Sequence, residues 1–105
     1  MSRIAIVLKD NHIDNTVLFK VKKVIGDALQ DIKQRVEINE PLYSGVLFYN
    51  DHEDIVVQLK EVIDILEKEN ISYLIYELDE VLTDREDNQI ISREVLERIV
   101  DWQSR

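Results

Sequence analysis

Apolar residues recur along the chain with two different spacings, and these spacings separate strands from helices. Three short runs are rich in β-branched and aromatic residues and are bounded by polar positions, as is typical of buried strands. These runs are residues 3–9, 42–49 and 72–78. Elsewhere apolar residues recur every three or four positions, which predicts amphipathic helices. The helical segments are residues 15–26, 27–37, 53–69 and 92–103.

Residues with special backbone or capping properties stand at the ends of the predicted helices. Asn15, Asp27 and Ser92 lie where a side-chain oxygen can accept the free amide protons of a first helical turn. Gly26 lies where the first helix ends, since glycine readily takes left-handed backbone angles. Asn70 follows the third helix at the place of a left-handed C-cap. These residues therefore predict the same helix ends as the apolar spacing does.

The order β-α-α-β-α-β, followed by a C-terminal helix, predicts an α+β fold. We expect a two-layer sandwich with a three-stranded sheet. An α/β fold with a small parallel sheet is the alternative, because it has nearly the same element order. A length of 105 residues is that of one domain. We divide it into a core over 1–78, an acidic loop over 79–91 and a C-terminal helix over 92–103. The apolar stripe of that helix can cover the sheet or exchange with a second copy, which leaves monomer and dimer open.

The net charge of −9 is unevenly distributed along the chain. Residues 1–50 carry seven Lys or Arg and six Asp or Glu, whereas residues 51–105 carry six and sixteen. An acid-rich half repels nucleic-acid backbones and attracts basic protein surfaces. We therefore expect a basic protein partner and no direct contact with nucleic acid.

Composition also limits the expected cellular location and the kinds of chemistry that are possible. No apolar run approaches the roughly 20 residues that a membrane-spanning helix needs, so no membrane partner is expected. The first residues lack the pattern of a secretory signal peptide, which leads us to expect a cytoplasmic protein. Cysteine is absent, which excludes disulfides and thiol chemistry. Glycine-rich motifs for phosphates or dinucleotides are absent too, and we expect no cofactor.

Two similar polar stretches raise the question of catalysis. The stretch "KDNHID" (9–14) follows the first predicted strand, and "YNDHED" (49–54) follows the second. If these strands were parallel neighbours, His12 and His52 would meet at one rim, with carboxylates that could complete a metal site or a general base. Helix capping explains both stretches more simply, because Asn and Asp end strands and begin helices. We therefore expect no metal, no catalytic residue and no enzyme, with a metal-dependent enzyme that uses both histidines as a further alternative.

The run "NTVLFKVKKVIGDALQDIKQRVEINEP" (15–41), together with the later strand "SYLIYEL" (72–78), resembles the C-terminal domain of the bacterial ribosomal stalk protein. The resemblance covers about residues 3–78. That family has the same β-α-α-β-α-β order, and the adaptor of the bacterial Clp protease shares this general fold. The positions that correspond to the family pattern are Gly26, Leu29, Asp31, Ile32 and Lys33.

The resemblance implies a protein that docks other proteins. Lys22 and Lys33 match basic positions through which the family meets elongation factors. The chain departs from the pattern where Ala28 replaces a glycine and where Gln30 and Phe19 replace basic residues. The segment after residue 78 has no counterpart in the family.

Two functions follow as hypotheses, both of them non-catalytic protein binding. In the first, the chain is an acidic inhibitor or immunity-type protein that masks a basic surface such as a nuclease toxin cleft. The expected partner-binding residues are Glu77, Asp79, Glu80, Asp84, Glu86 and Asp87. The alternative is a stalk-like docking module for translation factors, or an adaptor. Its expected residues are Lys20, Lys22, Lys23 and Lys33.

Overall fold

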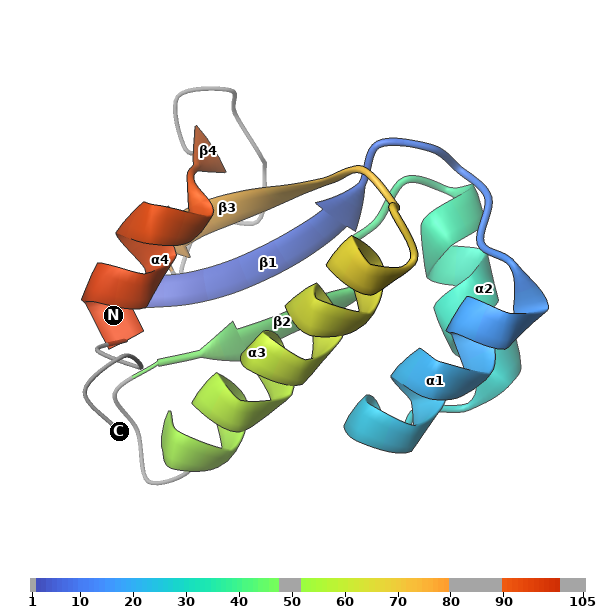
Figure 1. Cartoon of the computed structure of the whole chain (residues 1–105), viewed down its shortest axis with the longest axis horizontal. Helices are drawn as coiled ribbons and strands as arrows, with labels where there is room; N and C mark the ends of the chain where they lie inside the picture. Colours follow the sequence, from blue (N-terminus) through green and yellow to red (C-terminus); the bar gives the residue numbers. More distant parts are fainter. Residues whose placement is uncertain (1, 48–51, 80–89, 101–105) are drawn as a thin grey trace.

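The computed structural model describes residues 2–47, 52–79 and 90–100, which form an α+β fold of four helices and one antiparallel sheet (Figure 1). The predicted fold class is confirmed. The strands are β1 (Ser2–Leu8), β2 (Tyr43–Val46), β3 (Tyr73–Asp79) and β4 (Ile90–Ile91). The helices are α1 (Asn15–Ile25), α2 (Leu29–Glu37), α3 (His52–Lys68) and α4 (Arg93–Val100).

The sheet has the strand order β2-β1-β3-β4, and every neighbouring pair is antiparallel. The alternative of a small parallel sheet is therefore wrong. The sheet also has four strands where three were expected, because Ile90 and Ile91 pair with Tyr76 and Ile75 of β3. Two residues are too few to show an alternating pattern, so the fourth strand fell within the predicted loop 79–91.

The two faces of β1 enter two separate apolar clusters. Ile4, Ile6 and Leu8 belong to the main core, to which all four helices contribute buried side chains. Ala5 and Val7 point to the opposite face and pack with apolar residues of β3 in a second cluster, to which no helix of the described part contributes. The alternation follows from the two-residue period of a strand. The helices therefore form one layer on one face of the sheet (Figure 1).

The ends of the helices follow local backbone chemistry. Gly26 and Asn70 have left-handed backbone angles with φ of 79° and 57°, so both predicted C-caps are confirmed. The hydroxyl of Ser92 accepts a 3.1 Å hydrogen bond from the backbone amide of Val95, which confirms the predicted cap of the last helix. The predicted cap at Asp27 is wrong. The N-cap of α2 is residue 28, and the Asp27 carboxylate instead pairs with a side chain of α2 itself.

Leu96 and Val100 of α4 are fully buried in the main core. The last helix therefore covers part of the sheet within the chain, as expected for a two-layer domain. Within the described residues, no helix has both the length and the apolar character that crossing a membrane requires.

Candidate functional site

His12 and the backbone of residue 52, at the start of α3, lie toward opposite ends of the sheet. Arg3, at the start of β1, pairs with Val46, at the end of β2. His12 follows the end of β1, whereas His52 begins the helix that follows β2. Because neighbouring antiparallel strands run in opposite directions, the segments that follow them begin at opposite ends of the sheet. The arrangement that would bring both histidines to one rim is therefore wrong.

The surroundings of His12 are those of a surface residue. Its Nε2 lies 3.2 Å from the Oδ1 atom of Asp14, and both side chains are about three-quarters exposed. The described residues contain no group of three or more potential metal ligands. Asp14 is also the N-cap residue of α1, where a negative charge favours the helix dipole. Asp14 therefore occupies the start of a helix, but its carboxylate makes no capping hydrogen bond, so only its position agrees with the capping interpretation.

The predicted acidic partner-binding set falls largely outside the described residues. Glu80, Asp84, Glu86 and Asp87 all lie in the segment 80–89, and the side chain of Asp79 is not described either. Glu77 is half-buried on β3, where it pairs with Ile4 and so lies on the helix-covered side of the sheet. This set stays a prediction.

The outer side of α3 carries an acidic surface around an exposed apolar side chain. Val57 is 54% exposed, although it belongs to a helix whose inner side is fully buried. Glu53 and Asp54 lie one turn before it and Glu61 one turn after it, all of them exposed, and Lys60 lies beside them. We call Glu53, Asp54, Val57 and Glu61 the α3 acidic face. Acids in the first turn stabilise a helix, but Glu61 in the middle of α3 has no such role.

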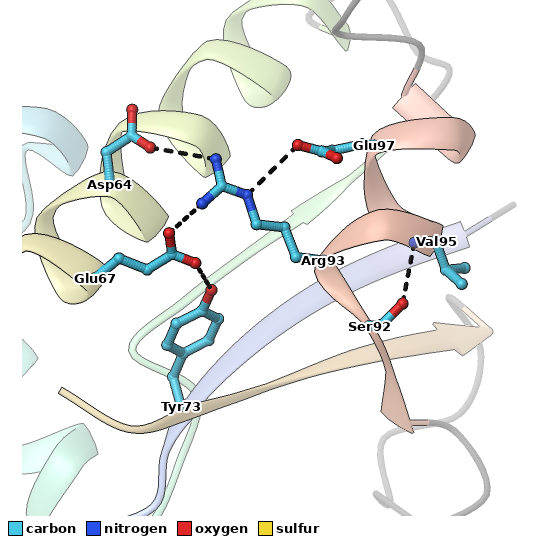
Figure 2. A network of polar contacts seen from close by, with 7 residues as sticks. All are labelled: Asp64, Glu67, Tyr73, Ser92, Arg93, Val95 and Glu97. Atoms are coloured by element: carbon cyan, nitrogen blue, oxygen red, sulfur yellow. Dashed lines mark hydrogen bonds and ion pairs between the residues drawn. The ribbon is translucent and has the colours of Figure 1, made fainter. Parts of the chain in front are cut away.

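Further along α3, the acids are used to hold α4 (Figure 2). Arg93 of α4 pairs with Glu67 and lies 3.6 Å from Asp64, and it also approaches Glu97 at 3.5 Å. The Tyr73 hydroxyl of β3 donates a 2.7 Å hydrogen bond to Oε2 of Glu67. Asp64 and Glu67 therefore connect α3 with α4 and β3. The residues of the α3 acidic face take no part in these contacts.

The basic residues of the alternative set occupy α1 and α2. Lys20 forms a 2.6 Å ion pair with Glu69 at the end of α3, so its charge already has a partner. Lys22 is half-buried, and Lys23 and Lys33 are exposed. Lys22 and Lys23 lie in the last turn of α1, where cations favour the helix dipole. Of the four lysines in this set, only Lys20 forms an ion pair within the described residues.

Phe19 adds an exposed aromatic ring to the surface of α1. Its side chain is 52% exposed, and Lys22 and Lys23 lie three and four positions further along the same helix. Such positions are neighbours on a helix surface. We call Phe19, Lys22 and Lys23 the α1 basic face.

Sequence reasoning missed the apolar member of each face as a binding residue. Val57 and Phe19 both fall outside the apolar stripe of their helix, and an apolar residue on the polar side was the signal that could have identified them. A single such residue is common on protein surfaces. Whether such a residue marks a binding surface therefore depends on the residues that the fold places around it.

The chain matches no protein-family model, and comparisons with curated proteins and with solved structures gave no match. The resemblance to the ribosomal stalk domain therefore stays a prediction. The functional interpretation depends on the surfaces described above.

Proposed function

We propose that the chain is a non-catalytic protein-binding module that uses the α3 acidic face to dock a basic surface of a partner protein. It would act in the cytoplasm as an inhibitor or immunity-type protein, with a nuclease toxin cleft as one such basic surface. The observation that carries the proposal is Val57, which is 54% exposed between acids on both sides. An apolar centre with a polar rim is the usual anatomy of a protein interface.

The two parts of this surface would contribute differently to binding. Burial of Val57 would supply part of the affinity, because apolar side chains at the centre of an interface lose water on binding. The carboxylates of Glu53, Asp54 and Glu61 would mainly raise the association rate and select cationic partners. The net charge of −9 would also attract cationic partners, over longer distances.

The test compares two variants with the same change in charge. The first is Glu53→Gln/Asp54→Asn/Glu61→Gln, which neutralises the α3 acidic face. The second neutralises three exposed acids elsewhere and is Asp10→Asn/Asp31→Asn/Glu37→Gln. A partner is captured with the wild-type chain and purified, and its association rate with each variant is then measured at low and high salt.

We expect the α3 variant to associate about tenfold more slowly at low salt, and we expect the difference to shrink at about 0.5 M salt. The matched variant should change the rate much less. Equal slowing by both variants would mean that only the net charge matters. In that case the proposed surface is wrong.

The α1 basic face supports a second candidate, a docking module that meets an acidic partner. The specific observation is Phe19, 52% exposed beside two lysines, because aromatic residues are enriched among the residues that dominate binding energy. In the same assay, a Phe19→Ala/Lys23→Gln variant would lose the captured partner under this candidate. The α3 variant would then bind normally, so one experiment separates the two.

A further inference from the structure

β2 is the strand at one edge of the sheet (Figure 1). It pairs with β1 on one side, and no strand of the described part pairs with the other. A pocket of about 550 Å³ lies along it and is lined from both faces of the sheet. Ile55 of α3 lines it on the helix-covered face, whereas the register places Ala5 and Leu78 on the opposite face. Because paired strands leave no opening between them, the hollow passes around the outer edge of β2, and we call it the β2 groove.

The hydrogen bonds of β1 show which of its residues bond to β2. The amide of Lys9, just after β1, donates a 3.1 Å hydrogen bond to the carbonyl of Ser72, just before β3. Successive residues of a strand turn their backbone groups to alternate sides, so the odd-numbered residues of β1 bond to β3, and Ile4 and Ile6 bond to β2. In agreement, the carbonyl of Ile6 accepts a 2.8 Å hydrogen bond from the amide of Leu42, just before β2.

The same alternation identifies the free backbone groups of β2. The register pairs the two β1 residues with Gly45 and Tyr43, which therefore bond to β1. Ser44 and Val46 turn their N–H and C=O groups to the outer side, where neither forms a hydrogen bond with the described part of the chain. An edge with such groups can pair with an extended segment of another protein.

The two sides of the β2 groove differ in charge. Asp27 and Glu40 flank α2 and line the groove beside Arg35, which is already paired with Asp27 at 3.0 Å. Gln58 of α3 also lines it and lies one turn from two acids of the α3 acidic face, so the groove borders that face. On the side away from the helices, Arg3 is the charged residue among the described lining residues. The helix side therefore favours cations, and the other side does not.

We propose that an extended segment of the basic partner pairs with β2 as an additional antiparallel strand. Its basic side chains would lie toward Glu40 and the α3 acidic face, and its apolar side chains toward Ala5 and Leu78. The inference rests on the proposed docking of a basic partner, and it adds how the backbone of that partner binds. The net charge of −9 on each chain opposes the pairing of two copies at this edge.

Strand geometry assigns the two kinds of side chain to the two sides. In an antiparallel pair, residues that exchange hydrogen bonds have their side chains on the same face. Partner residues that bond to Ser44 and Val46 therefore turn their side chains away from the helices, where Arg3 would repel a cation. The partner residues between them turn their side chains to the acidic helix side, and their N–H groups point away from β2.

The test uses the acetylated and amidated peptide Lys-Val-Lys-Val-Lys-Val-Lys with the full chain. One version is N-methylated on the valines, a second on the lysines, and a third has Glu in place of Lys. Affinity is measured by NMR titration at low salt. We expect valine methylation to weaken binding by about tenfold or more, because it removes the N–H groups that bond to β2, whereas lysine methylation should leave it nearly unchanged. The Glu peptide should also bind at least about tenfold more weakly.

Amide exchange shows where the peptide binds. Saturation with the unmethylated peptide should slow exchange at Ser44 and Val46, whose amides point to the outer side. Equal or reversed effects of the two methylations, equal binding of the Glu peptide, unchanged exchange at these amides, or no binding at millimolar concentration would overturn the inference. Slower exchange at higher protein concentration without peptide would show that a second copy occupies the edge instead.

The failure of this inference can be told apart from the failure of the proposed function. The two methylated peptides differ only in which backbone N–H groups they keep, so their comparison tests strand pairing and not charge. The association of the captured partner with the Glu53→Gln/Asp54→Asn/Glu61→Gln variant tests the α3 acidic face and not the backbone of β2. Slower association of that variant together with equal binding of both methylated peptides would therefore overturn the strand pairing alone.

Discussion

The hydroxyl of Tyr73 on β3 donates a 2.7 Å hydrogen bond to Glu67 on α3, and Arg93 on α4 pairs with the other oxygen of the same carboxylate (Figure 2). One carboxylate therefore connects a strand with two helices that are distant in sequence. Burial raises the pKa of the Tyr73 hydroxyl well above its ordinary value of 10.0, and the hydrogen bond and negative charge of Glu67 raise it further.

This relationship predicts a specific loss of stability in alkali. A group whose pKa is raised by folding holds its proton more tightly in the folded chain than in the unfolded one. The stability it contributes is therefore complete below pH 10.0 and is lost as the pH rises above this value. We expect the free energy of unfolding of the wild type, measured in urea, to fall more steeply above pH 10.0 than that of Tyr73→Phe.

Below that pH, Tyr73→Phe should cost about 1 kcal/mol, the usual net value of one hydrogen bond. The absorbance of tyrosinate provides an independent check. The part of the absorbance change that Tyr73→Phe removes should appear well above pH 10.0. If that part appears at or below pH 10.0, the hydroxyl is not held as the structure describes.

Gly45 allows α3 to lie close to β2. A Cβ atom at this position would be 2.6 Å from Cγ2 of Ile55, well inside van der Waals contact. We expect Gly45→Ala to lower the free energy of unfolding by about 1–3 kcal/mol, because the helix would have to move away from the strand. The measurement is urea unfolding followed by circular dichroism.

A second substitution tests the reason for this loss. Ile55→Leu removes the branched Cγ2 atom, so Gly45→Ala/Ile55→Leu should recover part of the stability that Gly45→Ala loses. Gly26→Ala serves as a contrast. It meets open space but has a φ of 79°, and it should cost about 1 kcal/mol for backbone reasons whichever residue is at position 55. Purely additive effects at 45 and 55 would contradict the steric explanation.

Ser92 holds the first turn of α4 through its 3.1 Å hydrogen bond to the amide of Val95. We expect Ser92→Ala to lower the free energy of unfolding by about 1 kcal/mol, the usual effect of removing an N-cap. Ser92→Asp should keep most of the stability, because aspartate caps helices about as well as serine. Amide exchange in α4 should be faster in the alanine variant alone.

Local patterns were sufficient to predict the class and order of most elements. Helical spacing, the left-handed positions Gly26 and Asn70 and the cap at Ser92 depend on neighbouring residues, so the sequence contains their signals. Strand direction has no such signal here. β1 is apolar on both faces, with Ala5 and Val7 buried as well as Ile4, and a continuous apolar strand is equally typical of a parallel sheet.

The candidate sites were harder to predict, because they depend on which elements the fold brings together. The expectation that His12 and His52 meet failed with the assumption of parallel strands. The exposure of Val57 and Phe19 likewise depends on which side of each helix the core covers, and that is decided by the packing of distant elements.

The unpaired donor of Arg3 predicts that this residue lowers the free energy of unfolding of the protein. Its Nε atom is buried without an acceptor, and an apolar side chain of similar length would avoid that cost. We expect Arg3→Met to raise the free energy of unfolding by about 1 kcal/mol, with Arg98→Met changing it by less than about 0.5 kcal/mol. A clear loss of stability in Arg3→Met would show instead that Arg3 supports the fold, for example through the packing of its aliphatic stem.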